Sequence, residues 1–367
     1  SFTYKRVNRN YADRQALLCE LRITYEDDTE EIIGTDESWD VTLDGAVKET
    51  EFYNGEVYDA TVDMEKISWH KASREQIKLH PEILAQYGAP VKAHEVFHPI
   101  SVTRAPSGVL IYDFGQNFAG YITFVNHQKK GTKLVFDFGE ILQHGNFYNE
   151  NYRSAKSQFV YISDGREELV RPTFTFFGFR YVRVTGWDGE LRKTDILGKA
   201  VYSDMEITGK IETGHAGVNR LFLNAMWGQK SNSIDFPTDC PQRGERTGWT
   251  GDAQVFVATA AYNMDIKNFM EKWLTDVRDG QLMYNRDGAV PDTAPLGGDN
   301  RRMGGCAGWG DAAVIVPWKL YLATGDIGIL EKNYDMMRAW VEYQSRTDRQ
   351  FDGVRTVDGE KLPECSD

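Results

Sequence analysis

Cysteine and long apolar segments are both scarce in this chain of 367 residues. The four cysteines, Cys19, Cys240, Cys306 and Cys365, lie far apart and form neither a CxxC pair nor a pattern with histidine. This spacing argues against a structural zinc site and a disulfide scaffold, so we expect mostly free thiols, with an approach of Cys240 to Cys306 left open. Apolar runs stay below about 18 residues, the length that spans a bilayer, so no membrane partner is expected.

Positive charge is the second shortage. Lysine and arginine number 42 against 55 aspartate and glutamate residues, which gives a net charge of −13, and no basic block stands out. Such a chain is a poor ligand for phosphate backbones and for anionic lipid surfaces. We therefore expect no nucleic-acid partner.

Signatures of metal and cofactor chemistry are missing or misplaced. The string from His94 to His98 reads HEVFH and matches the HExxH zinc signature, which needs a helix to bring both imidazole rings to one face. Pro99 follows at once and the surrounding residues alternate like a strand, so we attribute the match to chance. The glycine-rich run 297–305 lacks the Gly-Lys-Ser/Thr ending of a phosphate loop. No metal and no cofactor are expected.

Residues 1 to about 203 have the pattern of an all-β region. Residues 17–34 and 121–138 each contain two apolar stretches around a polar turn, and each predicts a hairpin. Short strands at nearly regular spacing are typical of β-sandwiches rather than of βαβ units. We predict a partial N-terminal β-sandwich at 1–88 and an accessory β-sandwich at 89–203.

The apolar periodicity changes to a helical one after residue 204. Asp265 and Asp326 suit helix N-caps, and Gly325 suits the position after a helix C-terminus. Helices joined by long, glycine-rich loops fit an α/α toroid, in which inner helix ends carry the site. The expected helices lie near 218–226, 253–263, 265–279, 311–323 and 326–345.

One stretch, residues 239–252, concentrates reactive side chains. It reads DCPQRGERTGWTGD, and its proline and glycines predict a loop that leads into a helix with Asp252 in the first turn. Cleaving a glycosidic bond needs a carboxylic acid and a carboxylate, and a sugar ring needs hydrogen-bond acceptors and an aromatic face. Arg243 and Arg246 are expected to neutralise the acids and to hold Asp239 and Asp252 ionised. A helix cap with a solvated ion-pair loop is the competing interpretation.

The same run closely resembles the active-site signature of the bacterial and fungal α-L-rhamnosidases of glycoside hydrolase family 78, D-x-P-x-R-D/G-E-R-x-G-W-x-G-D. The resemblance implies that Glu245 is the general acid, with a pKa raised by the neighbouring acids and by partial burial. It also implies that the rhamnose is held by Asp239, Arg243, Trp249 and Asp252. Hydrolysis in this family inverts the anomeric centre, with a second glutamate as the base. The base lies further along the family's chain, so we expect it outside these 367 residues.

Two later segments also resemble the family's pocket. One ends in the Pro-Asp pair at Asp292, and the other is the Gly-Trp-Gly-Asp start of a helix around Trp309. The resemblance implies that Asp292 accepts a hydrogen bond from a sugar hydroxyl and that Trp309 stacks on the ring, with Asp299 a weaker candidate. Asp311 is better explained as a capping or first-turn acid of its helix.

The combined expectation is a multidomain chain of all-β sandwich domains followed by the first part of an (α/α)6-toroid catalytic domain at 204–367. The family's toroid has twelve helices and about five are recognisable here, so we expect a fragment of a larger α-L-rhamnosidase acting on rhamnose-containing glycosides, oligosaccharides or polysaccharides. Apolar inner faces of a partial toroid favour self-association into a homo-oligomer. A non-catalytic carbohydrate-binding or structural fragment is the alternative. The compartment, bacterial cytoplasm, periplasm or exterior, stays open, because signal peptides are removed from mature chains.

Overall fold

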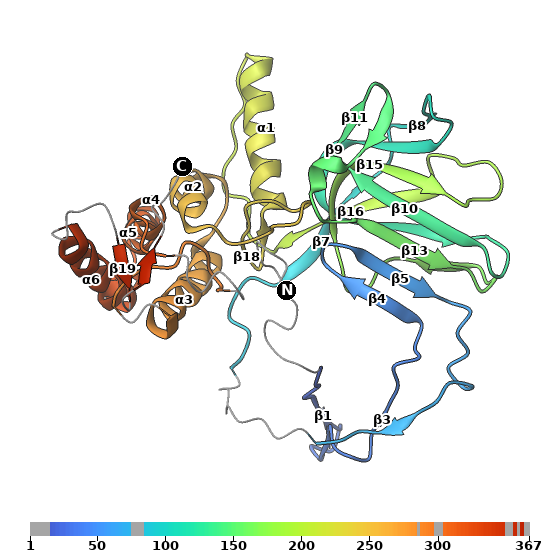
Figure 1. The fold of residues 1–367 in the computed structure, drawn as a ribbon, viewed down its shortest axis with the longest axis horizontal. Helices are drawn as coiled ribbons and strands as arrows, with labels where there is room; N and C mark the ends of the chain where they lie inside the picture. Colours follow the sequence, from blue (N-terminus) through green and yellow to red (C-terminus); the bar gives the residue numbers. More distant parts are fainter. Residues whose placement is uncertain are drawn as a thin grey trace.

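The computed structural model of the protein describes residues 15–74, 84–284, 287–296, 304–348, 355–357 and 360–362. The candidate Asp299 lies outside these ranges. Figure 1 shows a β-rich part, coloured blue to green, beside a helical part, coloured yellow to red. Helix α1 (Ala216–Ser231) stands where the two parts meet. The expected order, β-rich first and helical second, is confirmed.

A ten-stranded sheet forms most of the β-rich part. Its strands are β4 (Val47–Glu51), β5 (Gly55–Asp59), β7 (Val91–Phe97), β8 (Ser101–Arg104), β9 (Leu110–Asn126), β10 (Lys133–Gly139), β13 (Gln158–Ile162), β14 (Glu168–Val170), β15 (Phe177–Thr185) and β16 (Ile196–Ser203). They follow the order β4-β5-β13-β10-β15-β9-β16-β7, and β8 and β14 also pair with β9. Strands β5 and β13 run parallel.

Short two-stranded pairs surround this sheet. They are β1 (Glu20–Thr24) with β2 (Glu30–Gly34), β3 (Asp40–Val41) with β6 (His70–Lys71), β11 (Ile141–Gln143) with β12 (Asn146–Tyr148), β17 (Ser233–Ile234) with β18 (Phe236–Pro237), and β19 (Arg355–Val357) with β20 (Glu360–Leu362). A single 3₁₀ turn, η1 (Glu150–Tyr152), follows β12.

The sheet owes its core to the two-residue period of its central strands. On β9, Tyr112, Phe114, Ile122 and Phe124 lie at even positions, share one face of the strand and are buried in the aromatic core. Each such apolar side chain contributes about 1.5–3 kcal/mol when fully buried. This aromatic layer makes the sheet a rigid support for the loops at its edges.

One of the two predicted hairpins is confirmed and the other is wrong. Strands β1 and β2 pair antiparallel, with Leu21 opposite Ile33, as the pattern of residues 17–34 predicts. Strands β9 and β10, expected to pair across residues 127–132, do not lie next to each other. The two long edges of β9 are taken by β15 and β16, and β10 lies between β13 and β15. The local sequence pattern identified the two strands but not the distant strands with which they pair.

The division of the β-rich part at residue 88 remains a prediction. Strands β4 and β5, which precede that position, join the same sheet as the strands that follow it. Buried Glu56 on β5 strengthens this connection, because its carboxylate accepts from the amides of Thr173 and Phe174, each at 2.9 Å. The first stretch of the chain thus helps to build the central sheet.

The helical part contains α1, α2 (Thr250–Asn263), α3 (Lys267–Tyr284), α4 (Ala307–Gly310), α5 (Ala312–Thr324) and α6 (Gly328–Asp348). Helix α5 packs against α2, α3 and α6 around a core that includes Trp273 and Trp340. The predicted caps are confirmed. Asp265 accepts from the Lys267 amide, Asp326 accepts from the Gly328 amide, and Gly325 ends α5 in a left-handed conformation.

The two parts meet at α1 and at β7. Lys230 on α1 forms an ion pair with Glu95 on β7, and the hydroxyl of Tyr202 donates to the same carboxylate at 2.9 Å. His94 stacks on Tyr202 with ring centroids 3.8 Å apart. The HEVFH string therefore lies on a strand, and its charged residue joins the β-rich part to the helical part.

Two further expectations concern cysteine and the membrane. Cys19 and Cys240 are free thiols, whereas Cys306 is disulfide-bonded, so the expectation of free thiols is wrong at Cys306. Sequence spacing does not limit which cysteines meet in a folded chain. Within the described ranges, no helix has the length and apolarity needed to cross a bilayer.

Candidate active site

The candidate site is built on the loop that joins β18 to α2. The Thr247 amide donates to Asp239 Oδ1 at 2.8 Å, and the Asp239 amide donates to the Thr247 carbonyl oxygen at 3.0 Å, so the loop folds back on itself. Gly248 then accepts from the Ala294 amide at 2.8 Å. A Cβ atom on Gly248 would lie 2.0 Å from the Ala294 carbonyl oxygen, so this close approach requires glycine.

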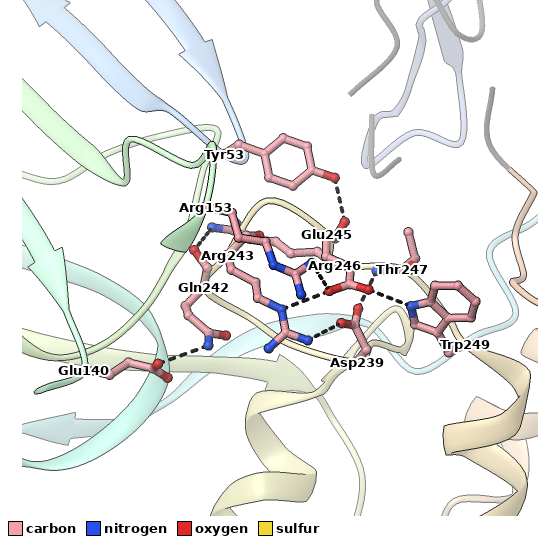
Figure 2. Close-up of polar contacts among 10 residues, drawn as sticks. All are labelled: Tyr53, Glu140, Arg153, Asp239, Gln242, Arg243, Glu245, Arg246, Thr247 and Trp249. Atoms are coloured by element: carbon pink, nitrogen blue, oxygen red, sulfur yellow. Dashed lines mark hydrogen bonds and ion pairs between the residues drawn. The ribbon is translucent and has the colours of Figure 1, made fainter. Parts of the chain in front are cut away.

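Glu245 lies in the middle of this loop, with 8 % of its side chain exposed. Its Oε2 accepts from Arg153 Nη1 at 2.7 Å and from Arg243 Nε at 2.9 Å. Its Oε1 accepts from Trp249 Nε1 at 3.1 Å. Figure 2 shows both guanidinium groups and the indole directed at this one carboxyl group. Three donors fix the orientation of the carboxyl group and favour its ionised form.

Asp239 shares Arg243 with Glu245. Arg243 Nη2 donates to Asp239 Oδ2 at 3.1 Å, while its Nε binds Glu245, so the guanidinium group lies between the two carboxyl groups (Figure 2). Burial, with a further contribution from the negative charge of Glu245, raises the pKa of Asp239 to about 6. Asp239 therefore stays protonated up to a higher pH than Glu245 does.

The expected ionisation is wrong for Glu245. Burial raises the pKa of Glu245, but the hydrogen bond from Arg243 and the charges of Arg243 and Arg153 outweigh it, so the pKa is lowered from its ordinary value. At Asp239 and Asp252 the charge of Arg243 favours the ionised form, as expected, but burial outweighs it. Burial raises the pKa of Asp252 as well, and the charge of Glu245 adds to that effect.

Arg246 does not face the acids, which corrects its expected role in neutralising them. The side chain is fully buried, and its backbone has a left-handed φ of +53° that turns it toward the β-rich part. Burial lowers the pKa of its guanidinium group to about 10. This group donates at 2.6–3.4 Å to backbone carbonyl oxygens of both parts of the protein, those of Phe52, Phe176, Gln242 and Arg243.

The β-rich part also supplies residues that sequence reasoning missed. Arg153 follows η1 and reaches Glu245, and the hydroxyl of Tyr53 donates to the Glu245 carbonyl oxygen at 2.7 Å. The Gly244 amide donates to the Tyr152 carbonyl oxygen at 3.1 Å. No local pattern around Arg153 or Tyr53 distinguishes them from surface residues. Only the fold brings them to the loop.

The two candidate tryptophans gather at the start of α2. The ring centroids of Trp249 and Trp309 are 6.4 Å apart, and the ring planes meet at 62°. Gly251 lies beneath Trp309, since a Cβ atom there would be 3.1 Å from the ring. The buried indole N–H of Trp309 has no hydrogen-bond partner within the described ranges. Both aromatic faces therefore lie beside the loop that carries Glu245.

The candidate carboxylates of α2 and of the following loop lie nearby. Asp252 is in the first turn of α2, and the carbonyl oxygen of buried Asp292 accepts from the Thr250 amide at 2.9 Å. A cavity of about 590 Å³ between α1, α2 and the start of α3 is lined by Asp239 and Asp252 together with mostly apolar side chains. Asp311 is at the N-cap of α5, where its carboxylate accepts from Trp340 Nε1 at 3.0 Å. This hydrogen bond joins the start of α5 to α6, so the role of Asp311 is structural.

A metal ion has poor access to the acidic cluster. Asp239, Cys240 and Glu245 place one donor atom each within 4.8 Å of one another. Arg243 and Arg153 already occupy the two carboxylates with positive charge. A cation there would face two guanidinium groups, so this donor set fits an arginine clamp better than a metal site.

Comparison with known proteins agrees with this arrangement. Residues 2–103 match an alpha-L-rhamnosidase N-terminal domain, residues 103–202 match a bacterial alpha-L-rhamnosidase concanavalin-like domain, and residues 206–361 match a bacterial alpha-L-rhamnosidase 6 hairpin glycosidase domain. The chain belongs to the bacterial α-L-rhamnosidase family. An alpha-L-rhamnosidase of Formosa agariphila is 36 % identical over 348 residues, which make up 91 % of this chain and 37 % of the relative. The chain thus spans about a third of the length of the curated rhamnosidases that it matches.

Solved rhamnosidase structures share the fold. The crystal structure of Streptomyces avermitilis alpha-L-rhamnosidase complexed with L-rhamnose is 36 % identical and superposes with a TM-score of 0.85, covering 95 % of this chain and 34 % of that one. The rhamnosidase of Dictyoglumus thermophilum is 31 % identical with a TM-score of 0.82, covering 95 % and 40 % of the two chains. The β-rich and helical parts thus match both rhamnosidases in one superposition.

Proposed function

We propose that this chain carries the rhamnose-binding and proton-donating part of an inverting glycoside hydrolase that releases terminal α-L-rhamnose. Glu245 is the general acid of this proposal, and the base lies outside these residues. The supporting observation is the carboxyl group of Glu245, buried and held by Arg153, Arg243 and Trp249. The kinship with a rhamnosidase solved with L-rhamnose supports the choice of sugar.

The acid needs a proton at the moment the glycosidic bond breaks. Of the two neighbouring acids, Asp239, whose pKa is about 6, holds a proton more readily than Glu245. A bound sugar ring removes water from Glu245, and loss of hydration favours the neutral form of a carboxyl group. Substrate binding therefore shifts the proton preference of the pair toward Glu245, which then donates to the departing oxygen.

The remaining candidates are proposed as the sugar subsite. Asp239, Asp252 and Asp292 supply acceptors for hydroxyl groups, and Arg243 fixes Asp239 against Glu245. The rings of Trp249 and Trp309 offer apolar faces to the C–H side of the sugar. Of these acceptors, Asp292 and the side chain of Asp239 are buried, and a buried acceptor discriminates strongly, because a sugar that lacks the matching hydroxyl leaves it unpaired.

Asp239 is a poor candidate for the base. Inverting hydrolases separate their two carboxyl groups by about 6.5–9.5 Å to admit a water molecule and a sugar between them. Asp239 and Glu245 place oxygen atoms within 4.8 Å, with Arg243 bridging them. We therefore propose that the base comes from elsewhere in a complete enzyme. We further propose that α1–α6, from residue 204 onward, form the first part of an (α/α)6 toroid, which fits the packing of α5 on α2, α3 and α6.

The acid assignment is tested with two leaving groups in a protein that carries these residues together with the remaining length that the relatives have. Glu245→Gln is expected to lower kcat by about 10²–10⁴-fold on an alkyl α-L-rhamnoside, whose departing oxygen needs a proton. The loss should be smaller on p-nitrophenyl α-L-rhamnopyranoside, because nitrophenolate leaves without protonation. Glu342→Gln, at a side chain that is 67 % exposed on α6, is the matched control. Equal, small losses on both substrates would remove Glu245 from this role.

Calorimetry separates the proposal from the alternative of a non-catalytic fragment. The present chain is expected to bind L-rhamnose, and Asp239→Ala is expected to abolish that binding. Binding by a complete protein that never hydrolyses a rhamnoside would support a carbohydrate-binding role. Absence of both binding and hydrolysis would leave a structural role.

A further inference from the structure

The loop between β18 and α2 cannot neutralise its own acids. Arg246 is committed to four backbone carbonyl oxygens, which leaves Arg243 as the cation that the loop directs at Asp239 and Glu245. Burying two carboxylates beside one guanidinium group is unfavourable unless a second counter-charge is present. That counter-charge comes from the β-rich part, in which Arg153 Nη1 lies 2.7 Å from Glu245 Oε2.

We propose that Arg153 is a positioning residue for the candidate acid: its guanidinium group fixes the Glu245 carboxyl group and sets its charge state from the β-rich part of the protein. The inference rests on the proposed role of Glu245 as the acid. Arg153 belongs to none of the substrate-binding candidates, and 51 % of its side chain remains exposed.

The backbone at Arg153 supports this role. Its φ of +57° lies in the left-handed region, which costs a residue other than glycine roughly 1–3 kcal/mol. Neighbouring contacts hold the strain, since Tyr152 accepts from the Gly244 amide at 3.1 Å and donates its hydroxyl to the Gly178 carbonyl oxygen at 2.6 Å. Glycine would relieve the strain but would remove the guanidinium group.

The contact between the two segments is close. A Cβ atom on Gly244 would clash with Ser154 Oγ unless that hydroxyl moved, so the segment after η1 lies directly against the loop. Tyr53 adds a second contact from the β-rich part, through its hydroxyl bond to the Glu245 carbonyl oxygen. Movement of the two parts relative to each other would therefore displace Arg153 from the acid.

The geometry also selects the oxygen that delivers the proton. Arg153 and Arg243 both donate to Oε2, whereas Oε1 accepts from Trp249 alone among the hydrogen bonds of the described residues. A proton on Oε2 would face two positively charged donors. Arg153 thus directs protonation to Oε1, on the side of Trp249.

The charged and titratable groups around Glu245 define the test. They are Arg153 from the segment after η1, Arg243, Asp239 and Cys240 from its own loop, and Asp252 from α2. The indole N–H of Trp249 donates to Glu245 Oε1, so its ¹H–¹⁵N signal reports the ionisation of that carboxyl group in the present chain. Glu245→Gln should abolish the change of this signal with pH, which assigns that change to the Glu245 carboxyl group.

Arg153→Gln is expected to raise the midpoint of this titration by roughly one pH unit, because an opposite charge within hydrogen-bond distance favours the ionised carboxylate by about 1–3 units and Arg153 is half exposed. Arg153→Lys keeps the charge but loses the fixed planar fork, so its midpoint should lie between those of the unaltered protein and of Arg153→Gln. Arg166→Gln, a matched loss of an exposed arginine on the same part of the chain, should leave the midpoint unchanged. An unaltered midpoint in both Arg153 variants overturns the proposal.

A second measurement follows the unaltered protein and uses a variant for signal assignment alone. In the unaltered protein, the guanidinium ¹⁵N signals of Arg153, assigned by their loss in Arg153→Lys, should shift at the same pH as the Trp249 signal. Arg153 signals that stay constant through that transition would refute the contact. Neither titration depends on rhamnose, so a chain that fails to bind or cleave rhamnosides while showing both shifts would reject the proposed function and retain the role of Arg153.

Discussion

The raised pKa of Asp239 makes the stability of this protein depend on pH in a defined direction. The carboxyl group is 5 % exposed, and its pKa is about 6 against an ordinary value of 3.8. The folded state therefore binds more protons than the unfolded state between pH 3.8 and 6. Stability contributed by this group is fully present below pH 3.8 and is lost as pH rises through 6.

The magnitude follows from the size of the shift. A change from 3.8 to about 6 corresponds to about 3 kcal/mol at 1.36 kcal/mol per pKa unit. Asp239→Asn removes this titration. It also weakens the contact with Arg243, but that loss is nearly constant with pH. The unfolding free energy of Asp239→Asn, minus that of the unaltered chain, should therefore increase by about 2.4 kcal/mol between pH 4 and pH 7, because part of the full effect appears only below pH 4.

Urea unfolding of both proteins at several pH values measures this difference directly. Asp335→Asn is the matched control, because its carboxyl group is 90 % exposed on α6. The unfolding free energy of this control should change with pH in parallel with that of the unaltered chain. A difference between Asp239→Asn and the unaltered chain that stays flat from pH 4 to pH 7 would contradict the burial of an acid beside Glu245.

Three further changes test separate features of the loop. Arg246→Met removes the guanidinium donor from four backbone carbonyl oxygens, of which those of Arg243 and Phe176 also accept from the Glu245 amide and the Thr175 hydroxyl. It should lower the unfolding free energy by at least about 2 kcal/mol in urea titrations, and a loss below 1 kcal/mol would contradict its structural role. Gly248→Ala places a methyl group 2.0 Å from the Ala294 carbonyl oxygen, so we expect a lower melting temperature and loss of rhamnose affinity, and full retention of both would disprove the close approach. Trp249→Ala should weaken L-rhamnose binding in calorimetry by at least about fivefold, whereas Trp318→Ala, at a ring that is 45 % exposed on α5, should not.

Local sequence patterns predicted the helical part well. The helices, the caps at Asp265 and Asp326, and the left-handed Gly325 all depend on residues a few positions apart. The loop before α2 was predictable for the same reason, since Pro241 and the glycines that follow it disfavour a helix. The resemblance to family 78 then identified the acids of this loop as candidate site residues.

Distant contacts were beyond such reasoning. Arg153 is 92 positions from Glu245 in the sequence, and Tyr53 is 192 positions away. The two loop arginines illustrate the same limit. Arg243 and Arg246 are equally basic in sequence, yet the left-handed backbone at Arg246 turns one toward carbonyl oxygens while the other binds both acids. The ionisation of Glu245 was misjudged because the distant Arg153 helps Arg243 to lower its pKa.

L-Rhamnose titrated into the ¹⁵N-labelled chain gives the most direct test of the central claim, that the loop from Asp239 to Asp252 forms a rhamnose site around Glu245. Saturable shifts of the indole signals of Trp249 and Trp309 are expected, with no shift for exposed Trp318 and no response to D-mannose. Asp239→Ala should abolish the shifts. Rhamnose binding that leaves Trp249 and Trp309 unmoved, or that persists unchanged in Asp239→Ala, would contradict the account.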